Sequence, residues 1–268
     1  MMMTDARTQR IKEFFDQDSV QYVQERYPTE PRNCDQFSYI VRKKYVLEML
    51  DRTGPAGRLL DLGCGPAILT RDLAARGWRV SGMDLSSGML AAASRSTADL
   101  VRGSARFTAG EATRLPFQTG SFNTVLCIGV VSYIDDVSVL LNEVHRVLKP
   151  GGQAIFQISN ASSIAGVDAW LWHQIRKFQA RYRQLDAHDS FRTAVKLHWN
   201  RPGAFNTWCR AAGLSRREFR FYDFRPPVAI DRLSQSTALA VGKKLEAIGG
   251  SALSTVLASG YLVRVARS

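Results

Sequence analysis

The sequence has few of the residues that build metal centres or disulfide frameworks. Only four cysteines and four histidines occur among 268 residues. The cysteines form no CxxC pair and have no histidine at metal-ligand spacing, which excludes the common zinc motifs and predicts no metal site. They are Cys34, Cys64, Cys127 and Cys209. Unpaired cysteines of this kind are typical of reduced thiols in a cytoplasmic protein.

Long apolar runs are also lacking. The opening MMMTDARTQRIKEFF has no apolar core of a signal peptide. The longest apolar candidate, ALSTVLASGYLVRVA, is shorter than the ~20 residues of a membrane helix and is interrupted by Ser, Gly and Arg. With 45% hydrophobic and 22% charged residues, the composition is that of a folded domain. We therefore expect a cytoplasmic protein without a transmembrane segment.

Acidic residues are outnumbered by basic ones, 24 to 36, and the net charge is +12. Between Asp168 and Arg225, 12 Lys and Arg stand against 5 Asp and Glu. Such an excess favours acidic substrates, anionic membrane surfaces or nucleic acid. A basic surface without a specific partner is an equal alternative, so peripheral membrane contact stays open at this point, as does the oligomeric state.

Short apolar segments alternate with helical ones after residue 57. Helical spacing covers much of residues 1–50, and the segments RLLDLG, RVSGMDLS, ARFTAG, FNTVLCIGVV and GQAIFQIS predict strands. This alternation predicts a parallel sheet with helices on both faces. Residues 164–200 predict helices only. A helix, the strand SRREFRFYDF, another helix and the strand STVLASGYLVRVA follow.

The segment LLDLGCGP at residues 59–66 joins the first strand to a glycine turn. Gly63 and Gly65 let the backbone approach a ligand, and we predict that the next helix begins near Pro66. Asp84 ends the second strand roughly 20 residues later, where a carboxylate can accept both hydroxyls of a ribose. A dinucleotide GxGxxG motif would need glycine at Ile68, and no GxxxxGK[ST] loop occurs, so NAD and ATP are disfavoured.

Further motifs follow in order: Gly110-Glu111-Ala112, Leu115-Pro116-Phe117, Ser121-Phe122 and Leu148-Lys149-Pro150-Gly151-Gly152. With the glycine turn and Asp84, they make residues 58–160 resemble the class I S-adenosylmethionine-dependent methyltransferases of the small-molecule, methyltransferase-11-like type. Glu111, Asn123 and Tyr133 depart from the Asp, Asp and His that are commoner there.

The resemblance implies a fold and its division along the chain. We expect a doubly wound, seven-stranded, mostly parallel sheet of the Rossmann-like methyltransferase type, with an antiparallel last strand. Residues 1–50 would form a helical cap, 51–160 the S-adenosylmethionine-binding core, 161–200 a helical lid insertion, and 201–268 the remainder of the core sheet.

The resemblance also implies a cofactor site for S-adenosylmethionine. In it, Asp61 and the turn from Gly63 through Cys64 to Gly65 hold the methionine moiety, and Asp84 binds the ribose. The adenine would meet Leu85 and Glu111, with Ala112 beside them. The remaining implied cofactor contacts are Met89, Cys127 and Ile128, with Tyr22 and Arg42 from the N-terminal helices. For Tyr22 and Arg42, a packed tyrosine and a surface arginine are equal alternatives.

Three residues are candidates for catalysis. Tyr133 follows the fourth strand, where a phenol would orient the acceptor or relay its proton, although a packed aromatic is an alternative. His173 and His198 lie in the lid region and are candidate general bases for a hydroxyl acceptor. Nearby aromatic residues at near-helical spacing predict packing within the lid or a wall of the acceptor pocket. They are Trp170, Trp172, Phe178 and Tyr182.

These features together predict a methyltransferase that acts on a small molecule. We favour O-methylation of a secondary or lipid-linked metabolite, with an acceptor that is acidic or amphiphilic. Methylation of RNA or protein is an alternative prompted by the positive charge, but the chain has no recognisable RNA-binding module, so no specific nucleic-acid partner is expected. A regulatory protein that binds the cofactor without catalysis is a second alternative.

Overall fold

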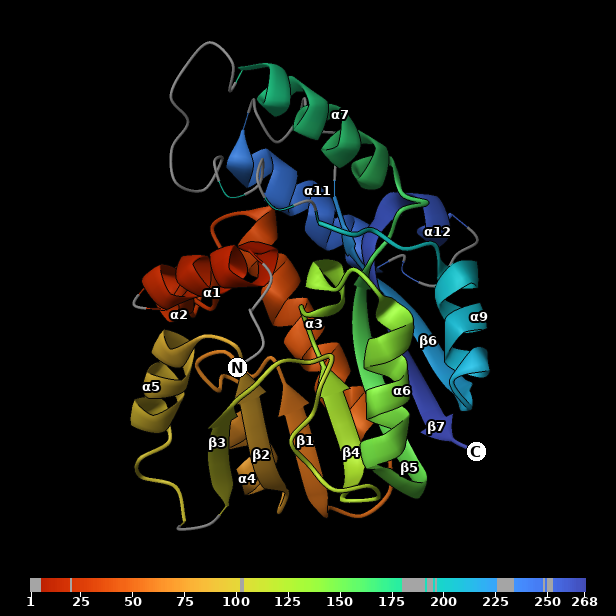
Figure 1. Ribbon diagram of the computed structural model, residues 1–268. Coiled ribbons are helices and arrows are strands. Elements are labelled where there is room, and N and C mark those ends of the chain that lie inside the picture. The colour runs from red at the N-terminus through yellow and green to blue at the C-terminus, as the bar shows by residue number, and fades with distance from the viewer. Residues whose placement is uncertain are drawn as a thin grey trace.

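The computed structural model describes residues 6–19, 21–101, 104–179, 191, 195, 197–225, 234–247, 249 and 253–268. Its strands form one sheet in the order β3-β2-β1-β4-β5-β7-β6 (Figure 1). They are β1 (Arg58–Leu62), β2 (Arg79–Asp84), β3 (Ala105–Ala109), β4 (Phe122–Cys127), β5 (Leu148–Ser159), β6 (Leu214–Phe224) and β7 (Ala258–Arg267). Strands β1 to β5 pair in parallel, whereas β7 runs antiparallel to both β5 and β6. The predicted fold class is confirmed.

Helices cover both faces of this sheet. One face packs against α6 (Val137–Val147) and α9 (Pro202–Ala211), and the other against α3 (Cys34–Leu50) and α4 (Thr70–Ala75). The remaining helices are α1 (Ala6–Asp18), α2 (Tyr22–Arg26), α5 (Ser87–Ser96), η1 (Val131–Tyr133), α7 (Ile164–Gln179), α11 (Gln235–Ala247) and α12 (Ser254–Leu257). Burial on both faces explains why the central strands are apolar at nearly every residue.

Helix α6 shows how the sequence specifies one of these layers. Five of its apolar residues recur at helical spacing and are buried: Val137, Leu140, Leu141, Val144 and Val147. Val139 lies on the exposed side of the helix. Asp136 caps the helix by accepting a hydrogen bond from the backbone N–H of Ser138 (2.9 Å). The cap and the apolar stripe together fix the end of the loop between β4 and α6.

Several predicted boundaries are wrong, and each has a local cause. Helix α4 begins at Thr70 instead of near Pro66, because Gly65 (φ 52°) and Ala67 (φ 61°) adopt left-handed conformations that a right-handed helix excludes. The sequence predicts that the helix after the fourth strand is stopped by Pro150, whereas α6 ends at Val147, since Leu148 already pairs with Phe122 in the sheet. Strand β4 ends at Cys127, so residues 128–130 lie in a loop, and residues 254–257 form α12 instead of starting the last strand.

The predicted helical region 164–200 is only partly helical where it is described. Helix α7 ends at Gln179, and residues 197–199 have no regular structure. Asn200 forms a single bridge with Asn160. Tyr182 lies outside the described residues, and so does the side chain of Trp172. Helices α1, α2, α7 and α11 lie beyond the carboxyl ends of the parallel strands (Figure 1). Among the described helices, none is both long enough and apolar enough to cross a membrane.

Candidate cofactor and methyl-transfer site

The glycine turn lies where the strand order reverses, between β1 and its neighbours β2 and β4. Ligands of doubly wound sheets bind at the carboxyl ends of the strands at this point. The N–H groups of Gly63 and Cys64 both donate to the carbonyl of Met83 (2.7 and 3.1 Å). Gly63 has φ 72°, and a Cβ there would lie 2.2 Å from Cγ2 of Val130. A Cβ on Gly65 would meet nothing within 4 Å, so the turn leaves open space on its outer side.

Asp84 joins this turn to the start of α5. Its Oδ2 accepts from the N–H of Gly65 (2.8 Å), and its Oδ1 accepts from the N–H of Ser86 (2.9 Å). Burial raises the pKa of Asp84, although these backbone N–H groups oppose the shift. Ser86 in turn caps α5 through Met89 N–H (3.0 Å). The carboxylate therefore has a fixed orientation, and each of its oxygens keeps a lone pair for a further donor.

Asp61 is a buried carboxylate beside the same turn. It is only 4% exposed, and no described residue donates a hydrogen bond to it. Burial, followed by repulsion from Asp84, raises the pKa of Asp61 from 3.8 to about 7. A buried carboxylate of this kind is stabilised by a cationic ligand such as an ammonium group.

The raised pKa gives a pH prediction for the ligand-free protein. Because Asp61 holds its proton more tightly when folded, the free energy of unfolding should fall as pH rises from about 4 to 7, by roughly 4 kcal/mol at most. Asp61→Asn should remove this dependence and be more stable than the natural protein at pH 8. Urea unfolding of both proteins at pH 5 and pH 8 measures the difference. An equal loss of stability in both would contradict the assignment.

Arg42 of α3 reaches the same edge of the sheet. Its Nη1 lies 3.8 Å from the position that a Cβ on Gly129 would take, just after β4. Nη2 donates to the hydroxyl of Tyr27 (3.1 Å), and the guanidinium lies 4.5 Å from the ring centre of Tyr39. Within the described residues, Arg42 forms no ion pair with a carboxylate. An arginine surrounded by neutral phenols can bind an anionic group of a ligand.

Tyr22 belongs to a neighbouring cluster. The guanidinium of Arg26 lies 4.1 Å from its ring centre and pairs with Asp18 (2.6 Å). Burial raises the pKa of Tyr22, which keeps the phenol neutral. Asp61 and Arg42 thus place a carboxyl group and a guanidinium at this edge of the sheet, and the space on the outer side of Gly65 is open.

The other predicted cofactor residues differ in how they are placed. Glu111 is exposed and accepts from the hydroxyl of Thr113 (2.8 Å), whereas Leu85 is half-buried. Cys64, Met89 and Cys127 are buried, and Ala112 and Ile128 are half-buried against the two cores. The side chain of Cys64 packs on β2, with its Sγ 2.9 Å from the Cβ position of Gly82. The roles of these residues stay predictions.

The loop after β4 brings Tyr133 and His198 together. The N–H of His198 donates to the carbonyl of Ser132 (2.8 Å), and its Nε2 lies 2.8 Å from Oδ1 of Asp135. Tyr133 packs edge-on against Phe15 of α1 at 5.5 Å between ring centres. His173, the other predicted base, lies on α7, which packs against β7 and α12 instead. The structure thus separates the two histidines that the sequence did not distinguish.

Two residues of α1, which no sequence pattern singled out, contact the loop after β4 and the start of α5. Arg7 donates to the carbonyl of Tyr133 (2.6 Å) and lies 3.3 Å from Asp135. Asp16 accepts from the hydroxyl of Ser86 (2.6 Å) and the N–H of Gly88 (2.8 Å). Although burial opposes it, hydrogen bonds from Lys12, Ser86 and Gly88 lower the pKa of Asp16 to about 2. No motif marks these residues, because their partners are far away in the sequence.

Two members of the predicted aromatic set have described side chains on α7. Trp170 and Phe178 are 64% and 60% exposed. Both rings lie largely at the surface instead of inside a core of the lid, which is the packing that the sequence favoured. The packing of the other two members stays a prediction, because Tyr182 and the side chain of Trp172 lie outside the described residues.

Comparison with known proteins identifies the family. Residues 60–156 match the model of the methyltransferase domain family. Over 182 residues, the chain is 30% identical to the ubiquinone biosynthesis O-methyltransferase of Pseudomonas aeruginosa (strain UCBPP-PA14), covering 66% of this chain and 72% of that protein. With the enzyme of the same name from Aromatoleum aromaticum, it shares 30% identity over 200 residues, which is 71% of this chain and 79% of that one.

Solved structures share the fold at low identity. Magnesium protoporphyrin IX methyltransferase (ChlM) from Synechocystis, crystallised with bound S-adenosylhomocysteine, superposes with a TM-score of 0.64 at 14% identity, covering 98% of this chain and all of that one. The [4+2]-cyclase SpnF superposes with a TM-score of 0.63 at 18% identity, covering 97% and 96%. The chain therefore belongs to the S-adenosylmethionine-dependent methyltransferases of the methyltransferase domain family.

Proposed function

We propose that this methyltransferase transfers the methyl group of S-adenosylmethionine to a hydroxyl oxygen of a small amphiphilic molecule. The observation that carries the proposal is the His198–Asp135 pair beside Tyr133 at the end of β4. A histidine oriented by a carboxylate is suited to take the proton of a hydroxyl as the new C–O bond forms. The names of the two O-methyltransferase relatives support the same reaction.

The cofactor supplies an activated methyl group on its sulfonium, so the chain has chiefly to hold and align the reactants. Asp61 would bind the ammonium group and Arg42 the carboxylate of the methionine moiety, while Asp84 would accept the ribose hydroxyls. The glycine turn gives the ligand access to the backbone. Arg7 and Asp16 fix α1 over this edge of the sheet and limit the access of water.

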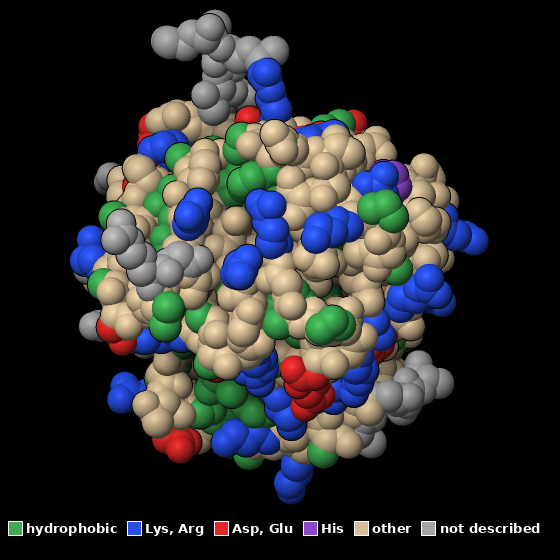
Figure 2. Space-filling view, turned by 90° about the horizontal axis from the view of Figure 1, so that it is seen from below, with side chains coloured by type: hydrophobic (Ala, Val, Ile, Leu, Met, Phe, Trp, Pro, Cys, Tyr) green, Lys and Arg blue, Asp and Glu red, His purple; other side chains and the backbone are tan. Residues whose placement is uncertain are grey.

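The main alternative acceptor is RNA. In Figure 2, which looks at the amino ends of the parallel strands, Lys and Arg side chains are scattered over the surface and do not form one stripe. The positive charge visible there is at the opposite end from the glycine turn. Scattered charge on this face favours solubility and weak nonspecific binding over the recognition of an RNA strand there.

Labelled cofactor tests the proposal directly. The purified protein would be incubated with methyl-labelled S-adenosylmethionine and a cell extract, which is then separated into lipid, water-soluble, RNA and protein fractions. We expect the label in an organic-soluble small molecule, as an alkali-stable methyl ether. Label in RNA or protein would overturn the proposal. So would binding of S-adenosylhomocysteine without transfer of label, the outcome for a regulator that only binds the cofactor.

The lid proposed for residues 161–200 includes α1 in its closure. Phe14 of α1 stacks on Phe191 with 3.9 Å between ring centres, and Asp16 ties α1 to α5. Asp16→Ala should lower the local free energy of opening by about 1–2 kcal/mol, because it removes the hydrogen bonds from Ser86 and Gly88, and speed amide exchange of α1 about 5–30-fold. Exposed Asp99→Ala is the control. Unchanged exchange in Asp16→Ala, or equal exchange with and without S-adenosylhomocysteine in the natural protein, would count against a lid.

An exposed apolar stripe on α7 supports an amphiphilic acceptor. Among the described side chains of α7, five apolar ones at helical spacing are exposed: Ile164, Val167, Trp170, Leu171 and Phe178. Helix α12 packs beside α7 and adds exposed Val256. An apolar stripe on a protein of net charge +12 is suited to the surface of an anionic bilayer, from which a lipid-linked acceptor would be taken.

A vesicle-binding experiment tests whether the apolar stripe on α7 binds an anionic bilayer. We expect the protein to sediment with vesicles of 70% phosphatidylcholine and 30% phosphatidylglycerol, and more weakly with phosphatidylcholine alone. Replacing Trp170, Leu171 and Phe178 by serine should reduce the partition coefficient at least about tenfold, because three apolar side chains are lost. Val101→Ser is the control, since Val101 is 82% exposed and lies in the segment between α5 and β3. Equal loss in both variants, or no binding by the natural protein, would remove the membrane from the proposal.

A further inference from the structure

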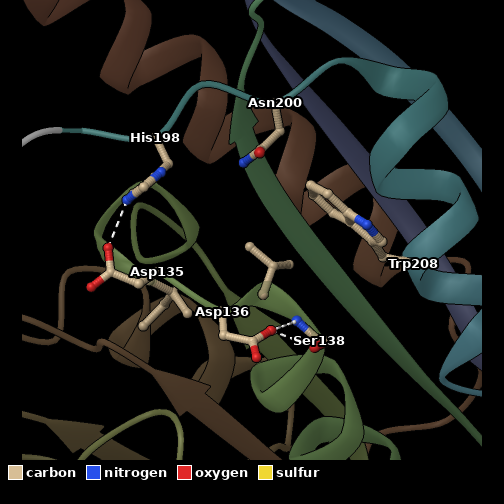
Figure 3. Close-up of a pocket in the computed structure, with 8 residues that line it drawn as sticks. Asp135, Asp136, Ser138, His198, Asn200 and Trp208 are labelled. Carbon is tan, nitrogen blue, oxygen red and sulfur yellow. Dashed lines mark hydrogen bonds and ion pairs between the residues drawn. The ribbon is translucent and has the colours of Figure 1, made fainter.

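The proposed base is held by a carboxylate that is itself exposed. Figure 3 shows His198 and Asp135 turned toward each other at the edge of a hollow of about 220 Å³, one from the segment before α9 and the other from the loop after β4. Nε2 of His198 lies 2.8 Å from Oδ1 of Asp135, but the Asp135 side chain is 60% exposed. Exposed side chains change rotamer readily, so this one bond does not by itself fix the imidazole.

Arg7 of α1 holds the second oxygen of the same carboxylate. Its Nη1 lies 3.3 Å from Oδ2 of Asp135 and donates to the carbonyl of Tyr133 at 2.6 Å. An ion pair in full solvent stabilises little, but the Arg7 side chain is only 20% exposed and has the carbonyl as a second anchor. With one oxygen toward Arg7 and the other toward His198, the carboxylate is held in a single orientation.

The backbone on either side of this pair is held independently. The N–H of His198 donates to the carbonyl of Ser132 (2.8 Å), and the hydroxyl of Ser132 lies 3.1 Å from that of Ser159 at the end of β5. These contacts join the loop after β4 to the segment before α9 without using either side chain of the pair. The rotation of the Asp135 side chain is therefore the freedom that Arg7 removes.

Arg7 reaches the carboxylate from a helix that is held at its other end. Asp16, near the end of α1, accepts from the hydroxyl of Ser86 (2.6 Å) and the N–H of Gly88 (2.8 Å) at the start of α5. This point lies next to the carboxylate proposed to bind the ribose, which accepts from the N–H of Ser86. Arg7 and Asp16 stand nine residues apart, ~13 Å along the helix. One helix thus connects the ribose side of the site to the base.

We propose that Arg7 is a positioning residue for methyl transfer. Through Asp135 it fixes the imidazole of His198, so the proton acceptor is oriented only while α1 is docked over the site. The inference rests on the proposed function in one respect, namely that His198 takes the proton of the acceptor hydroxyl. If Arg7 instead competed with His198 for the carboxylate, its removal would strengthen the orientation, so the sign of the change decides.

Nitrogen NMR of protein with isotopically labelled histidine measures this orientation without methyl transfer. The two ring nitrogens of a neutral imidazole differ most in shift when one tautomer is fixed, and they approach each other when the tautomers exchange. The chain has four histidines, and His198→Gln assigns the signals of His198. We expect Arg7→Ala to narrow their separation nearly as much as Asp135→Ala does. Asp16→Ala, which frees the other end of α1, should narrow it in part.

The rate of methyl transfer gives a second measure. We expect Arg7→Ala to lower the initial rate of label transfer from S-adenosylmethionine to the organic-soluble fraction of the extract about tenfold to 100-fold, because a displaced base costs this much. KM for S-adenosylmethionine should stay within about twofold. Millimolar guanidinium chloride should restore part of the rate, whereas sodium chloride at the same ionic strength should not. In an Asp135→Ala background, Arg7→Ala should change the rate less than about twofold, since its effect passes through that carboxylate.

Arg10 provides the matched control. It lies on the same helix, is exposed, and forms no ion pair with a described residue, so Arg10→Ala should leave both the shift separation and the rate unchanged. Circular dichroism and the melting temperature verify folding, and Arg7→Lys, which keeps one donor, replaces Arg7→Ala should the latter not fold. An unchanged or wider separation in a folded Arg7 variant would overturn the proposal. A narrowed separation at an unchanged rate would support the orienting role of Arg7 and reject His198 as the base.

Discussion

Replacing Asp84 by alanine is expected to weaken the binding of S-adenosylhomocysteine by about 100-fold to 10,000-fold. The carboxylate would lose two charge-assisted hydrogen bonds to the ribose, each worth ~1.5–3 kcal/mol. It would also release the N–H groups of Gly65 and Ser86, which it holds at 2.8 and 2.9 Å. The loss should therefore appear as a lower affinity together with a looser glycine turn. Isothermal titration calorimetry measures the affinity.

Two further variants test whether the loss of affinity is specific to the carboxylate of Asp84. Asp84→Asn keeps the shape of the side chain and one acceptor oxygen, so an intermediate loss is expected. Glu111→Ala removes an exposed carboxylate that accepts a hydrogen bond from Thr113, and it should cost less than Asp84→Ala. Unchanged affinity in an Asp84→Ala protein with a natural circular dichroism spectrum would show that the ribose binds elsewhere.

The arrangement of Asp61, the glycine turn and Asp84 was predictable because each residue is fixed by its own strand. A parallel strand between two helices presents its carboxyl end at one edge of the sheet, so the order of motifs along the chain becomes an arrangement in space. The same local reasoning failed where the backbone conformation of a single residue determines where a helix begins. The left-handed φ of Ala67 delays the start of α4, and no sequence rule singles out an alanine for that conformation.

Contacts between distant segments were not predictable from local patterns. Asp16 lies 70 residues from Ser86, and Asp135 lies 63 residues from His198. Each partner alone resembles an ordinary surface residue. The helical spacing of Trp170 and Phe178 was visible, but periodicity does not say whether a stripe faces a core, a partner or solvent. Residues that act through long-range pairs therefore required the structure.

The sequence offers His198 and His173 equally as candidate general bases, whereas the structure places them in different surroundings. His198 is held at Nε2 by Asp135 and at its backbone N–H by Ser132. If Nε2 donates to the carboxylate, Nδ1 carries the free lone pair and can accept the proton of a hydroxyl. His173 lies on α7, away from the loop after β4.

We therefore expect His198→Ala to lower kcat for a hydroxyl acceptor by about 100-fold to 10,000-fold, the usual contribution of a general base, with little change in affinity for S-adenosylhomocysteine. Asp135→Asn should lower kcat less, because the imidazole remains but loses its orientation. Added imidazole should partly restore His198→Ala, which a structural role would not allow. His173→Gln is the matched control and should stay within about twofold of the natural enzyme. A base is needed only when the acceptor hydroxyl must lose its proton before or during methyl transfer. A kcat for His198→Ala within twofold of the natural value would therefore assign the proton transfer to solvent or to another residue.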